Sequence, residues 1–457
     1  MSKPTPLSGF PELLPAQRAV EQQVLDTLRH VFELHGFAGV ETRAVEPLDV
    51  LLRKGDTAKE VYLLRRLHET SADGHAGLGL HFDLTVPFAR YVLEHAGHLE
   101  FPFRRYQVQK VWRGERPQEG RFREFTQADI DIVGRGELGT HHDAEVARVM
   151  VDALRRLDFL PGFTLQVNNR KVIAGYYAGL GITGGELVDE VMRQVDKLDK
   201  LPVESVRGEL VGPVGLDDAT AERVLALAAV RATDAAALEA DVRALGVTDP
   251  LLEEGLAELV GVLGACAGLV DDRVSVVADL SVARGLDYYT GTVFETRLRG
   301  WESLGSICSG GRYDALATDG RTTYPGVGIS FGVSRVVVPL LARTGLAADR
   351  AVPSAVLVAL PDEASRAHAD AVADRLRARD VPCEVAATPQ RFGKQIRYAE
   401  RRGIPYVWFP APAGTDGETT EHEVKDIRSG EQVTADPDTW TPPTEDLRPR
   451  VQAKEQQ

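Results

Sequence analysis

The sequence has little of what marks secreted, membrane-spanning or metal-binding proteins. Its three cysteines, Cys266, Cys308 and Cys383, lie far apart and show no paired spacing, so we expect neither a disulfide framework nor a zinc site. No stretch approaches the roughly 20 consecutive apolar residues that span a bilayer. The first residues, MSKPTPLSGFPELLP, contain no apolar stretch typical of a secretory signal. These absences together predict a protein of the reducing cytoplasm.

Basic residues are in the minority as well. The chain has 53 Lys and Arg against 68 Asp and Glu, which gives a net charge of −15. Such an overall field disfavours broad, non-specific binding to nucleic acid, but it leaves room for a local basic patch that binds one specific RNA. Common nucleotide-binding loops are also missing. No Lys-Ser or Lys-Thr follows the glycines of CSGGRYDAL (308–316), and no G-x-G-x-x-G stretch separates a strand from a helix.

The 457 residues suffice for two or three domains, and their pattern divides them. The segment 15–36 predicts an amphipathic helix, and its apolar stripe consists of Val20, Val24, Leu28, Val31 and Phe32. Alternating apolar and polar runs predict strands from about 37 to 133 and again from about 274 to 313. Between them, Ala, Leu, Glu and Asp dominate with helical periodicity. A helical insertion is therefore predicted to interrupt a sheet domain.

The remaining sequence predicts a second domain. Its pattern alternates strand, helix, strand, helix and strand, which indicates a small α/β domain with a largely parallel sheet. We thus expect a first sheet-domain segment (1–169), a helical insertion (170–275), a second sheet-domain segment (276–345) and the α/β domain (352–435). The polar, proline-bearing end (436–457) is expected to be a disordered tail.

Polar side chains gather in the segment FREFTQADIDIVG (122–134). Strand alternation places Gln127, Asp129 and Asp131 on one face and apolar residues on the other. Gln127 and Asp131 would lie roughly 13 Å apart along such a strand, so they could hold both ends of a small polar ligand. The solvated outer face of an antiparallel sheet would give the same pattern, and both interpretations stay open.

Arginines are concentrated just upstream, in and around a charged loop between two predicted strands. They are Arg113, Arg116, Arg121 and Arg123, with glutamates between them. Guanidinium groups suit phosphate because they donate two parallel, charge-assisted hydrogen bonds. A hairpin covered with surface ion pairs would look much the same.

HFDLTVPFAR (81–90) offers an acid beside a hydroxyl. Asp83 and Thr85 would share one face of a strand, where they suit a ligand ammonium group. The alternative is a turn or cap before a helix that starts near Val86 or Pro87.

Two further segments carry isolated polar groups. In LSVARGLDYYTGTVFE (280–295), Arg284 could meet a phosphate or a carboxylate. Strand alternation would point Tyr288 and Tyr289 to opposite faces, so at most one of them needs to line a pocket. The glycine-flanked strand GVGISFG leads into an apolar helix with one arginine, Arg335, which we expect to emerge at a pocket.

Taken in this order, the segments resemble one family, the histidyl-tRNA synthetases among the class II aminoacyl-tRNA synthetases. RGLDYYTG (284–291) and GGRYD (310–314) resemble its two histidine-specific signatures. VDKLDKL (195–201) and KQIRYAERRGIPYV (394–407) are similar to the family as well. The resemblance covers nearly the whole chain, from about 11 to 427.

This resemblance implies an α+β catalytic domain with an antiparallel sheet and a helical insertion, a C-terminal α/β anticodon-binding domain, and a homodimer. It also implies ATP-dependent ligation of L-histidine to its cognate tRNA. Histidine would attack the α-phosphate of ATP to give histidyl-adenylate and pyrophosphate. The histidyl group would then pass to the terminal ribose of the tRNA, releasing AMP. Mg²⁺ is expected to enter with ATP, with no metal held by the protein alone.

Residue roles at the nucleotide follow from the same resemblance. Arg113 and Arg284 match the catalytic arginines at the ATP α-phosphate, and both are expected to reach the histidine carboxylate. Glu115 matches the acid that reads adenine or its amino group. Arg121 is expected to reach the γ-phosphate or the tRNA end, and Arg335 matches the arginine that stacks on adenine and contacts the γ-phosphate.

The implied histidine site has an ammonium end and a ring end. The residues implied at the ammonium group are Asp83, Thr85 and Gln127. Asp131 and one or both of Tyr288 and Tyr289 are implied to bracket the imidazole. Groups that pair with the ring nitrogens would reject an analogue that lacks one.

The sequence departs from the family pattern at three positions. Ser334 precedes Arg335 where the family usually has an acid. Asp83 and Asp131 stand where many bacterial members carry glutamate, and these forms resemble the eukaryotic-type branch. The local positioning of Arg335 and the subgroup are therefore open questions at this stage.

In the last domain, basic and polar side chains fall near one helical face. They are Arg391, Lys394, Gln395, Tyr398 and Arg401. Such a face suits single-stranded anticodon bases, although a merely solvated helix explains it about as well.

Two other classes of protein compete with this interpretation. A non-catalytic regulatory paralogue, like the synthetase-like subunit of ATP phosphoribosyltransferase, would lack the C-terminal domain and usually the arginines. A prolyl or threonyl enzyme would share a similar C-terminal domain, but the segment RGLDYYTG, which resembles a histidine-specific signature, disfavours this class.

Overall fold

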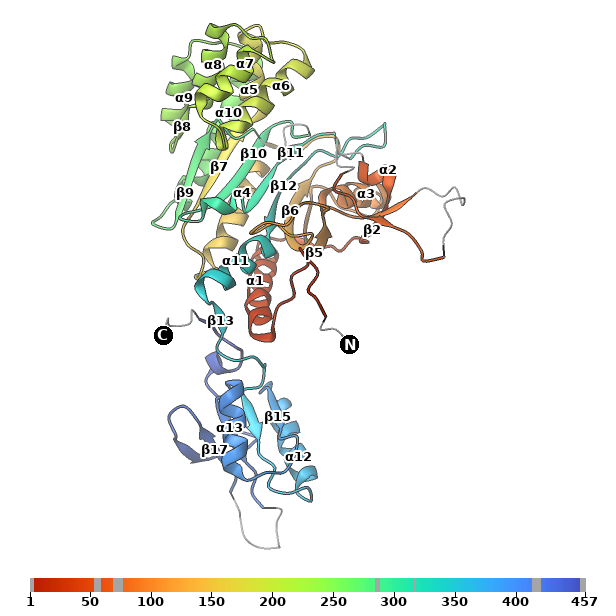
Figure 1. Cartoon of the computed structure of the whole chain (residues 1–457), viewed down its shortest axis with the longest axis vertical. Helices are drawn as coiled ribbons and strands as arrows, with labels where there is room; N and C mark the ends of the chain where they lie inside the picture. Colours follow the sequence, from red (N-terminus) through yellow and green to blue (C-terminus); the bar gives the residue numbers. More distant parts are fainter. Residues whose placement is uncertain are drawn as a thin grey trace. The chain divides into compact units, whose positions relative to one another are not determined.

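The computed structural model describes residues 4–52, 59–68, 77–283, 288–315, 317–412 and 421–452. The chain divides into two compact units (Figure 1). The first consists of residues 1–11 and 24–338, and the second of residues 12–23 and 339–457. No helix within the described ranges combines the length and the apolar character that a membrane span requires.

A nine-stranded sheet forms the centre of the first unit, in the order β1-β5-β6-β12-β11-β10-β7-β9-β8. The strands are β1 (Ala38–Gly39), β5 (Phe103–Trp112), β6 (Glu124–Val133), β12 (Gly326–Gly332), β11 (Cys308–Tyr313), β10 (Thr292–Leu298), β7 (Phe163–Asn169), β9 (Val274–Asp279) and β8 (Arg231–Ala232). All neighbours from β5 through β7 pair antiparallel, whereas β1–β5 and β7–β9 pair parallel. The predicted antiparallel sheet is thus confirmed over the six central strands, and the parallel pairs β1–β5 and β7–β9 make the whole sheet mixed.

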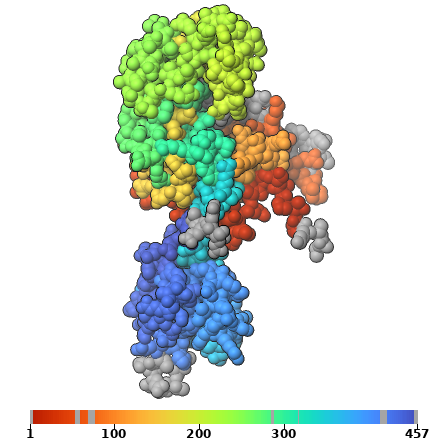
Figure 2. Space-filling model, turned by 60° about the vertical axis from the view of Figure 1, so that its left-hand side comes forward, coloured from red at the N-terminus to blue at the C-terminus, as the bar shows by residue number. Residues whose placement is uncertain are grey.

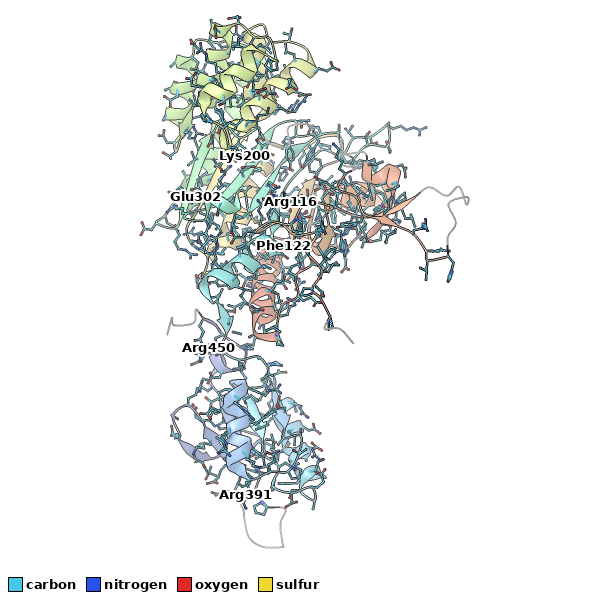
Figure 3. All side chains as sticks on the ribbon, viewed as in Figure 1. Arg116, Phe122, Lys200, Glu302, Arg391 and Arg450 are labelled. Carbon is cyan, nitrogen blue, oxygen red and sulfur yellow. The ribbon has the colours of Figure 1, made fainter. Side chains whose placement is uncertain are left out.

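Four helices accompany the sheet: α1 (Pro15–Leu34), α3 (Thr85–His95), α4 (His141–Arg155) and α11 (Val333–Thr344). The predicted apolar stripe of the first helix is buried at every position. Helix α4 lies against β6 and β12 and covers their apolar face, where Ile130 and Ile132 are fully buried. The opposite face of β6 is left to the polar row of the strand. Arg116 and Phe122, labelled in Figure 3, lie in the loop that joins β5 to β6.

A small three-stranded sheet, β2-β4-β3, adjoins this layer. Its elements are β2 (Val45–Pro47), α2 (Leu48–Leu51), β3 (Leu63–Leu64) and β4 (Leu78–Leu80). Residues 53–58 and 69–76, which belong to the same part of the sequence, lie outside the described ranges.

The predicted helical insertion follows β7. It contains α5 (Arg170–Gly179), α6 (Gly185–Val195), η2 (Asp196–Asp199), α7 (Val203–Val211), α8 (Asp218–Ala228), α9 (Ala235–Ala244), α10 (Pro250–Cys266) and η3 (Ala267–Leu269). Asp217, Asp234 and Asp249 cap three of these helices, because each carboxylate accepts a backbone N–H of the first turn. Helix α10 contacts α5, α4 and β7, so the insertion is joined to the sheet. Figure 2 shows its helices, in yellow-green, as one continuous mass.

The C-terminal part of the second unit is a five-stranded sheet with two helices. Its elements are β14 (Val356–Val358), α12 (Arg366–Arg377), β15 (Cys383–Val385), α13 (Phe392–Arg402), β16 (Tyr406–Phe409), β17 (Glu423–Asp426) and β18 (Gln432–Thr434). The order is β15-β14-β16-β17-β18, with the first three strands parallel and the last two antiparallel. The small α/β domain predicted here is therefore present, with two antiparallel strands added.

The end of the chain differs from the expectation of a disordered tail. Residues 436–452 fold back onto the domain, and η5 (Thr444–Asp446) buries Asp446. Its carboxylate accepts hydrogen bonds from the Tyr406 hydroxyl at 2.8 Å and from Arg428 at 2.8 Å. Strand β19 (Val451–Gln452) then pairs with β13 (Ala347–Ala348). The expectation is wrong for 436–452, because partners distant in the sequence hold this polar segment.

Candidate active site

Two cavities adjoin on the polar face of the large sheet. The first is lined by Asp83, Thr85, Arg113, Gln127, Asp129, Asp131, Tyr288, Tyr289, Ser309, Gly310, Gly311, Tyr313, Gly328, Ile329 and Ser330. The second is lined by Arg113, Glu115, Gly120, Arg121, Phe122, Phe125, Gln127, Ser306, Ile307, Ser309, Ser330, Gly332 and Arg335. Four residues line both cavities, namely Arg113, Gln127, Ser309 and Ser330. The structure thus brings together every described residue predicted for the histidine and ATP sites.

Asp83 and Thr85 enter the first cavity from the start of α3. Asp83 Oδ1 accepts the backbone N–H of Val86 at 3.1 Å, and Thr85 is the first helical residue. The expectation of a shared strand face is therefore wrong, and the alternative of a helix cap is correct. Both side chains nevertheless line the cavity. Capping and facing a ligand are compatible here, because a carboxylate has a second oxygen.

The row of polar residues on β6 forms the floor of the first cavity. Asp131 pairs in register with Gly328 of β12, and Asp129 with Ser330. A Cβ on Gly328 would lie 2.1 Å from Asp131 Oδ1, so the absence of a side chain makes room for the carboxylate. The outer face that the alternative interpretation assigned to solvent is thus the buried wall of a cavity.

Two residues that sequence reasoning missed hold Asp131. Arg105 Nη2 lies 2.6 Å from its Oδ2, and the Tyr313 hydroxyl donates to its Oδ1 at 2.9 Å. Tyr313 belongs to the GGRYD segment, which could have suggested it. Arg105 gave no signal, because its partner lies on a neighbouring strand and is set by register.

The two adjacent tyrosines both line the first cavity, contrary to the expectation that at most one is needed. Their ring centroids lie 4.1 Å apart. They precede β10, which begins at Thr292, so strand alternation does not apply to them. Burial raises the pKa of the Tyr288 hydroxyl, which keeps it a neutral donor. Arg284 lies outside the described residues.

The second cavity is rich in guanidinium groups. Arg113 Nε donates to the Phe82 carbonyl at 2.9 Å, which orients its guanidinium over the ring of Phe125 at 5.2 Å. Glu115 lies 3.7 Å from Arg113 and 3.4 Å from Arg121. On the other side, Arg335 Nε donates to a backbone carbonyl at 3.1 Å. Three cations against one carboxylate suit a polyphosphate.

Ser334, the departure next to Arg335, has a clear structural place. Its buried hydroxyl accepts the backbone N–H of Thr126 at 2.9 Å and so ties the start of α11 to β6. The arginine that follows is thereby held beside the second cavity without an acid before it.

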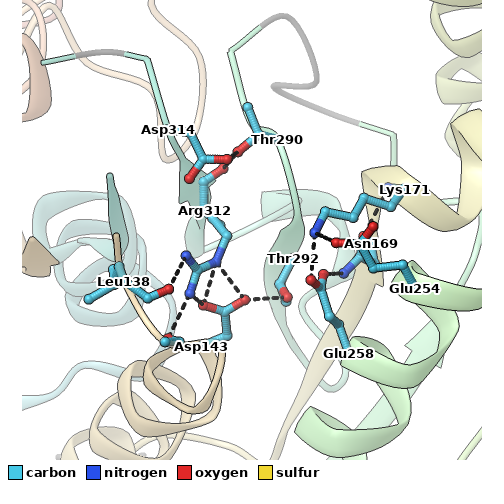
Figure 4. A network of polar contacts seen from close by, with 11 residues as sticks. Leu138, Asp143, Asn169, Lys171, Glu254, Glu258, Thr290, Thr292, Arg312 and Asp314 are labelled. Atoms are coloured by element: carbon cyan, nitrogen blue, oxygen red, sulfur yellow. Dashed lines mark hydrogen bonds and ion pairs between the residues drawn. The ribbon is translucent and has the colours of Figure 1, made fainter. Parts of the chain in front are cut away.

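The arginine of the GGRYD segment has a structural task. Arg312 is buried, and its guanidinium pairs with Asp143 of α4 at 2.7 Å (Figure 4). It also donates to the carbonyls of Leu138 and Gly139 at 3.0 and 2.9 Å, and Thr292 donates to Asp143 at 2.6 Å. This network fixes β11 against α4. The glycines of β11, Gly310 and Gly311, and Tyr313 consequently line the first cavity.

In the second unit, the predicted basic face of α13 is only partly exposed. Arg391, which Figure 3 labels directly before α13, and Lys394 are exposed, as is Arg401. Tyr398 is half-buried and donates to Glu384 at 3.0 Å. Gln395 is buried, and its amide bonds to the backbone N–H and carbonyl of Leu360.

Comparison with known proteins agrees with this geometry. The family model for histidyl-tRNA synthetase matches residues 9–336, and the model for an anticodon binding domain matches residues 354–439. A histidine–tRNA ligase of Cutibacterium acnes is 56% identical over 457 residues, covering 99% of both chains. One of Micrococcus luteus is 56% identical over 462 residues with the same coverage.

A solved structure agrees as well. The crystal structure of histidyl-tRNA synthetase from Nostoc sp. PCC 7120 is similar with a TM-score of 0.82 and 33% identity, covering 95% of this chain and 97% of that one. With both cavities, both domain matches and full-length similarity in agreement, the chain belongs to the histidyl-tRNA synthetase family, which ligates histidine to its tRNA.

Proposed function

We propose that the first cavity binds histidine and the second binds ATP. The observation that carries this assignment is the wall that the two cavities share: Arg113 and Gln127 line both of them. A carboxylate in one cavity and an α-phosphate in the other would meet at the Arg113 guanidinium. The carboxylate oxygen attacks phosphorus, the bond to the pyrophosphate oxygen breaks, and histidyl-adenylate forms. The terminal ribose of the tRNA then takes the histidyl group and AMP leaves.

Arg113 and Arg284 are the residues we propose for the chemical step. Charge builds on the α-phosphate oxygens as pyrophosphate departs, and a guanidinium that is already oriented stabilises it without reorganising. The hydrogen bond from Arg113 Nε to the Phe82 carbonyl supports this role. It uses only the Nε donor, so the two terminal nitrogens of the guanidinium remain for other partners. Arg284 carries its role from the family resemblance alone.

Selection of histidine is assigned to the ring end of the first cavity. Asp131 accepts a ring N–H there, and one or both of Tyr288 and Tyr289 serve the other nitrogen. Arg105 and Tyr313 support this role, because they fix both oxygens of the Asp131 carboxylate. An amino acid without ring nitrogens could not form these hydrogen bonds, and a site built to hydrogen-bond its substrate discriminates against such an analogue by about 10⁴ to 10⁵. Asp83, Thr85 and Gln127 are assigned to the ammonium group.

The remaining nucleotide contacts are assigned to the second cavity. Glu115 reads the adenine, Arg121 reaches the γ-phosphate or the tRNA end, and Arg335 stacks on adenine. Glu115 is the one carboxylate among the described lining residues, and it already faces two arginines. This donor set does not suit a protein-held cation, so we propose that Mg²⁺ enters bound to the phosphates of ATP.

The second unit is assigned to the anticodon of the histidine tRNA. Exposed Arg391, Lys394 and Arg401 support contact with single-stranded bases, with Tyr398 beside them. The bonds of the buried Gln395 amide suggest that it positions the helix. We further propose that the protein is cytoplasmic and forms a homodimer, as the family resemblance implies. Light scattering on the purified chain would test the dimer.

Histidine-dependent exchange of labelled pyrophosphate into ATP is the experiment that tests the reaction. Of the twenty amino acids, only histidine should support exchange. Exchange with proline or threonine instead would overturn the proposal, and so would the absence of exchange with any amino acid, which a regulatory paralogue would give.

A further inference from the structure

The middle acid of the β6 row has no place in the roles assigned above. Asp129 lies between Gln127 and Asp131 on the cavity face, and it lines the first cavity. It is only 2% exposed. Its Oδ1 is one of the buried polar atoms that have no hydrogen-bond partner among the described residues. A buried acceptor left in this state costs free energy unless a ligand satisfies it.

A second unsatisfied acceptor lies beside it. Gln127 Oε1 is also buried and without a partner among the described residues. The two side chains are joined through one hydroxyl, because Gln127 Nε2 donates to Ser330 Oγ at 2.8 Å and Ser330 in turn bonds to Asp129. Ser330 thereby orients both side chains, and each retains one buried acceptor atom without a partner among the described residues.

The chemistry of histidine indicates which of its groups would satisfy these two acceptors. Histidine offers one group with several donors and a positive charge, its α-ammonium, whereas a ring nitrogen offers at most one N–H. Asp131 at the far end of the row already has Arg105 as its counterion. Asp83 caps α3 with one oxygen and is already assigned to the ammonium group. Asp129 is a second acid that lines the same cavity, and its Oδ1 has no hydrogen-bond partner among the described residues.

We propose that Asp129 is a second counterion, beside Asp83, of the α-ammonium group of bound histidine and shares that group with Gln127. The proposal rests on the first cavity being the histidine site and adds a specificity residue to it. Through this pair, the enzyme requires a primary ammonium group on its substrate. A ligand with the ring but without that group would leave both acceptors unsatisfied.

The electrostatic surroundings of Asp129 link its protonation to the binding of the ligand. Burial raises the pKa of Asp129 to about 7, opposed by Arg105 and the Ser330 hydroxyl and reinforced by Asp131 and Asp83. Tyr288, Tyr313 and Cys308 also face this region, and burial raises the pKa of each, so all three stay neutral near pH 7. An ammonium group beside Asp129 would lower its pKa. Histidine binding near pH 7 should then release a proton, and affinity should fall as the pH drops below 7.

Two analogues separate the ammonium group from the ring. Histamine keeps the ammonium group and the ring but lacks the carboxylate, whereas 3-(imidazol-4-yl)propionate lacks the ammonium group. Binding of both, and of histidine, is measured by calorimetry on the full chain and on Asp129→Asn. The control variant is Asp158→Asn, which makes the same change at a side chain that is 95% exposed. Circular dichroism and a thermal melt establish that each variant is folded.

We expect Asp129→Asn to weaken histidine and histamine by about ten- to a hundredfold, the cost of one charge-assisted hydrogen bond, and to leave the propionate analogue within about twofold. An equal loss for both analogues would overturn the proposal by making Asp129 a ring partner. No loss for either would overturn it by making Asp129 structural. If the unaltered chain bound neither histidine nor either analogue, the assignment of the cavity itself would fail, and the proposal with it.

Proton release from the unaltered chain gives a second readout, which holds even if the variant does not fold. Calorimetry at pH 7 in two buffers of different ionisation enthalpy should show more protons released by histamine than by the propionate analogue. The free rings differ in pKa, because histamine carries an ammonium group near the ring and the propionate analogue a carboxylate. Each proton count is therefore corrected for the ring protonation of the free analogue at pH 7, measured by titration. Equal release by the two analogues would overturn the proposal.

Discussion

Arg105 and Asp131 form a buried ion pair across two strands of the catalytic sheet. Arg105 Nη2 lies 2.6 Å from Asp131 Oδ2, and the residues are register partners on β5 and β6. The guanidinium is fully buried and lies 4.2 Å from the centroid of the Phe88 ring. Since Tyr313 takes the other oxygen, the carboxylate has one available orientation. A carboxylate fixed in this way accepts a hydrogen bond only from a ring nitrogen at the matching position.

Replacing Arg105 by methionine tests this relationship. The change leaves a buried carboxylate without its counterion, so we expect a loss of about 3 kcal/mol in the free energy of unfolding. The KM for histidine in pyrophosphate exchange should rise at least about tenfold, and the KM for ATP should change little. Arg104→Met is the control, because Arg104 is the neighbouring residue of β5 and forms a partly exposed ion pair with Glu145 of α4. An unchanged KM for histidine in a less stable protein would show that Arg105 only supports the fold.

Gly328 should tolerate no side chain. A methyl group there would lie 2.1 Å from Asp131 Oδ1 and 2.6 Å from the Ile130 carbonyl, closer than any real contact. Gly328→Ala should therefore displace the Asp131 carboxylate and lower kcat/KM for histidine by about a hundredfold, comparable to the removal of one preorganised polar group. Gly97→Ala, where a methyl group would meet nothing within 4 Å, is the control. Equal activity of the two variants would contradict the role given to Asp131.

The sequence predicted much of the fold and of this site. Strand alternation placed Gln127 and Asp131 on one face of β6, because periodicity and a single strand suffice for that prediction. Arg105 could not be found in this way. An arginine within FRRYQVQKVW resembles any partly exposed strand residue, and only the register with β6 shows that it meets a carboxylate. The pairing across strands is a tertiary property.

Two other failures have the same origin. Strand alternation fails for Tyr288 and Tyr289, because both precede β10, which begins only at Thr292. The polar composition of the end of the chain predicts disorder. Asp446 nevertheless orders it through Tyr406, forty residues earlier in the sequence. Composition reports the hydrophobic contribution to order and misses long-range hydrogen bonds of this kind.

Ser334 should matter more for ATP than for histidine. Its hydroxyl accepts the buried N–H of Thr126, and Ser334→Ala leaves that donor unsatisfied at a cost of about 1 to 3 kcal/mol. Because Arg335 follows directly and lines the second cavity, the KM for ATP should rise several-fold while the KM for histidine stays within about twofold. Ser334→Thr keeps the hydroxyl and should retain normal values. Equal increases in both KM values would contradict this local role.

The exposed basic residues of the C-terminal domain should affect only the step that involves tRNA. Arg391→Ala combined with Lys394→Ala should lower kcat/KM for tRNA in aminoacylation by about tenfold and leave pyrophosphate exchange unchanged, because both residues are exposed and belong to the second unit. Gln395→Ala should instead lower the melting temperature, since its amide bonds to buried backbone. A loss of pyrophosphate exchange in the double variant would contradict the assignment.

Arg312 provides a test of structure without direct chemistry, although it lies within a histidine-specific signature. Its guanidinium pairs with Asp143 and with two backbone carbonyls (Figure 4), so Arg312→Met should cost about 3 to 5 kcal/mol in the free energy of unfolding. Arg321→Met, at an exposed position in the loop between β11 and β12, should cost almost nothing. The decisive variant is Arg312→Met with Asp143→Leu. Removing both charges leaves neither one buried alone, so chemical denaturation should show a loss well below the sum of the two single losses. Additive losses would mean that the two side chains act independently, and the network would then not be what holds β11 against α4.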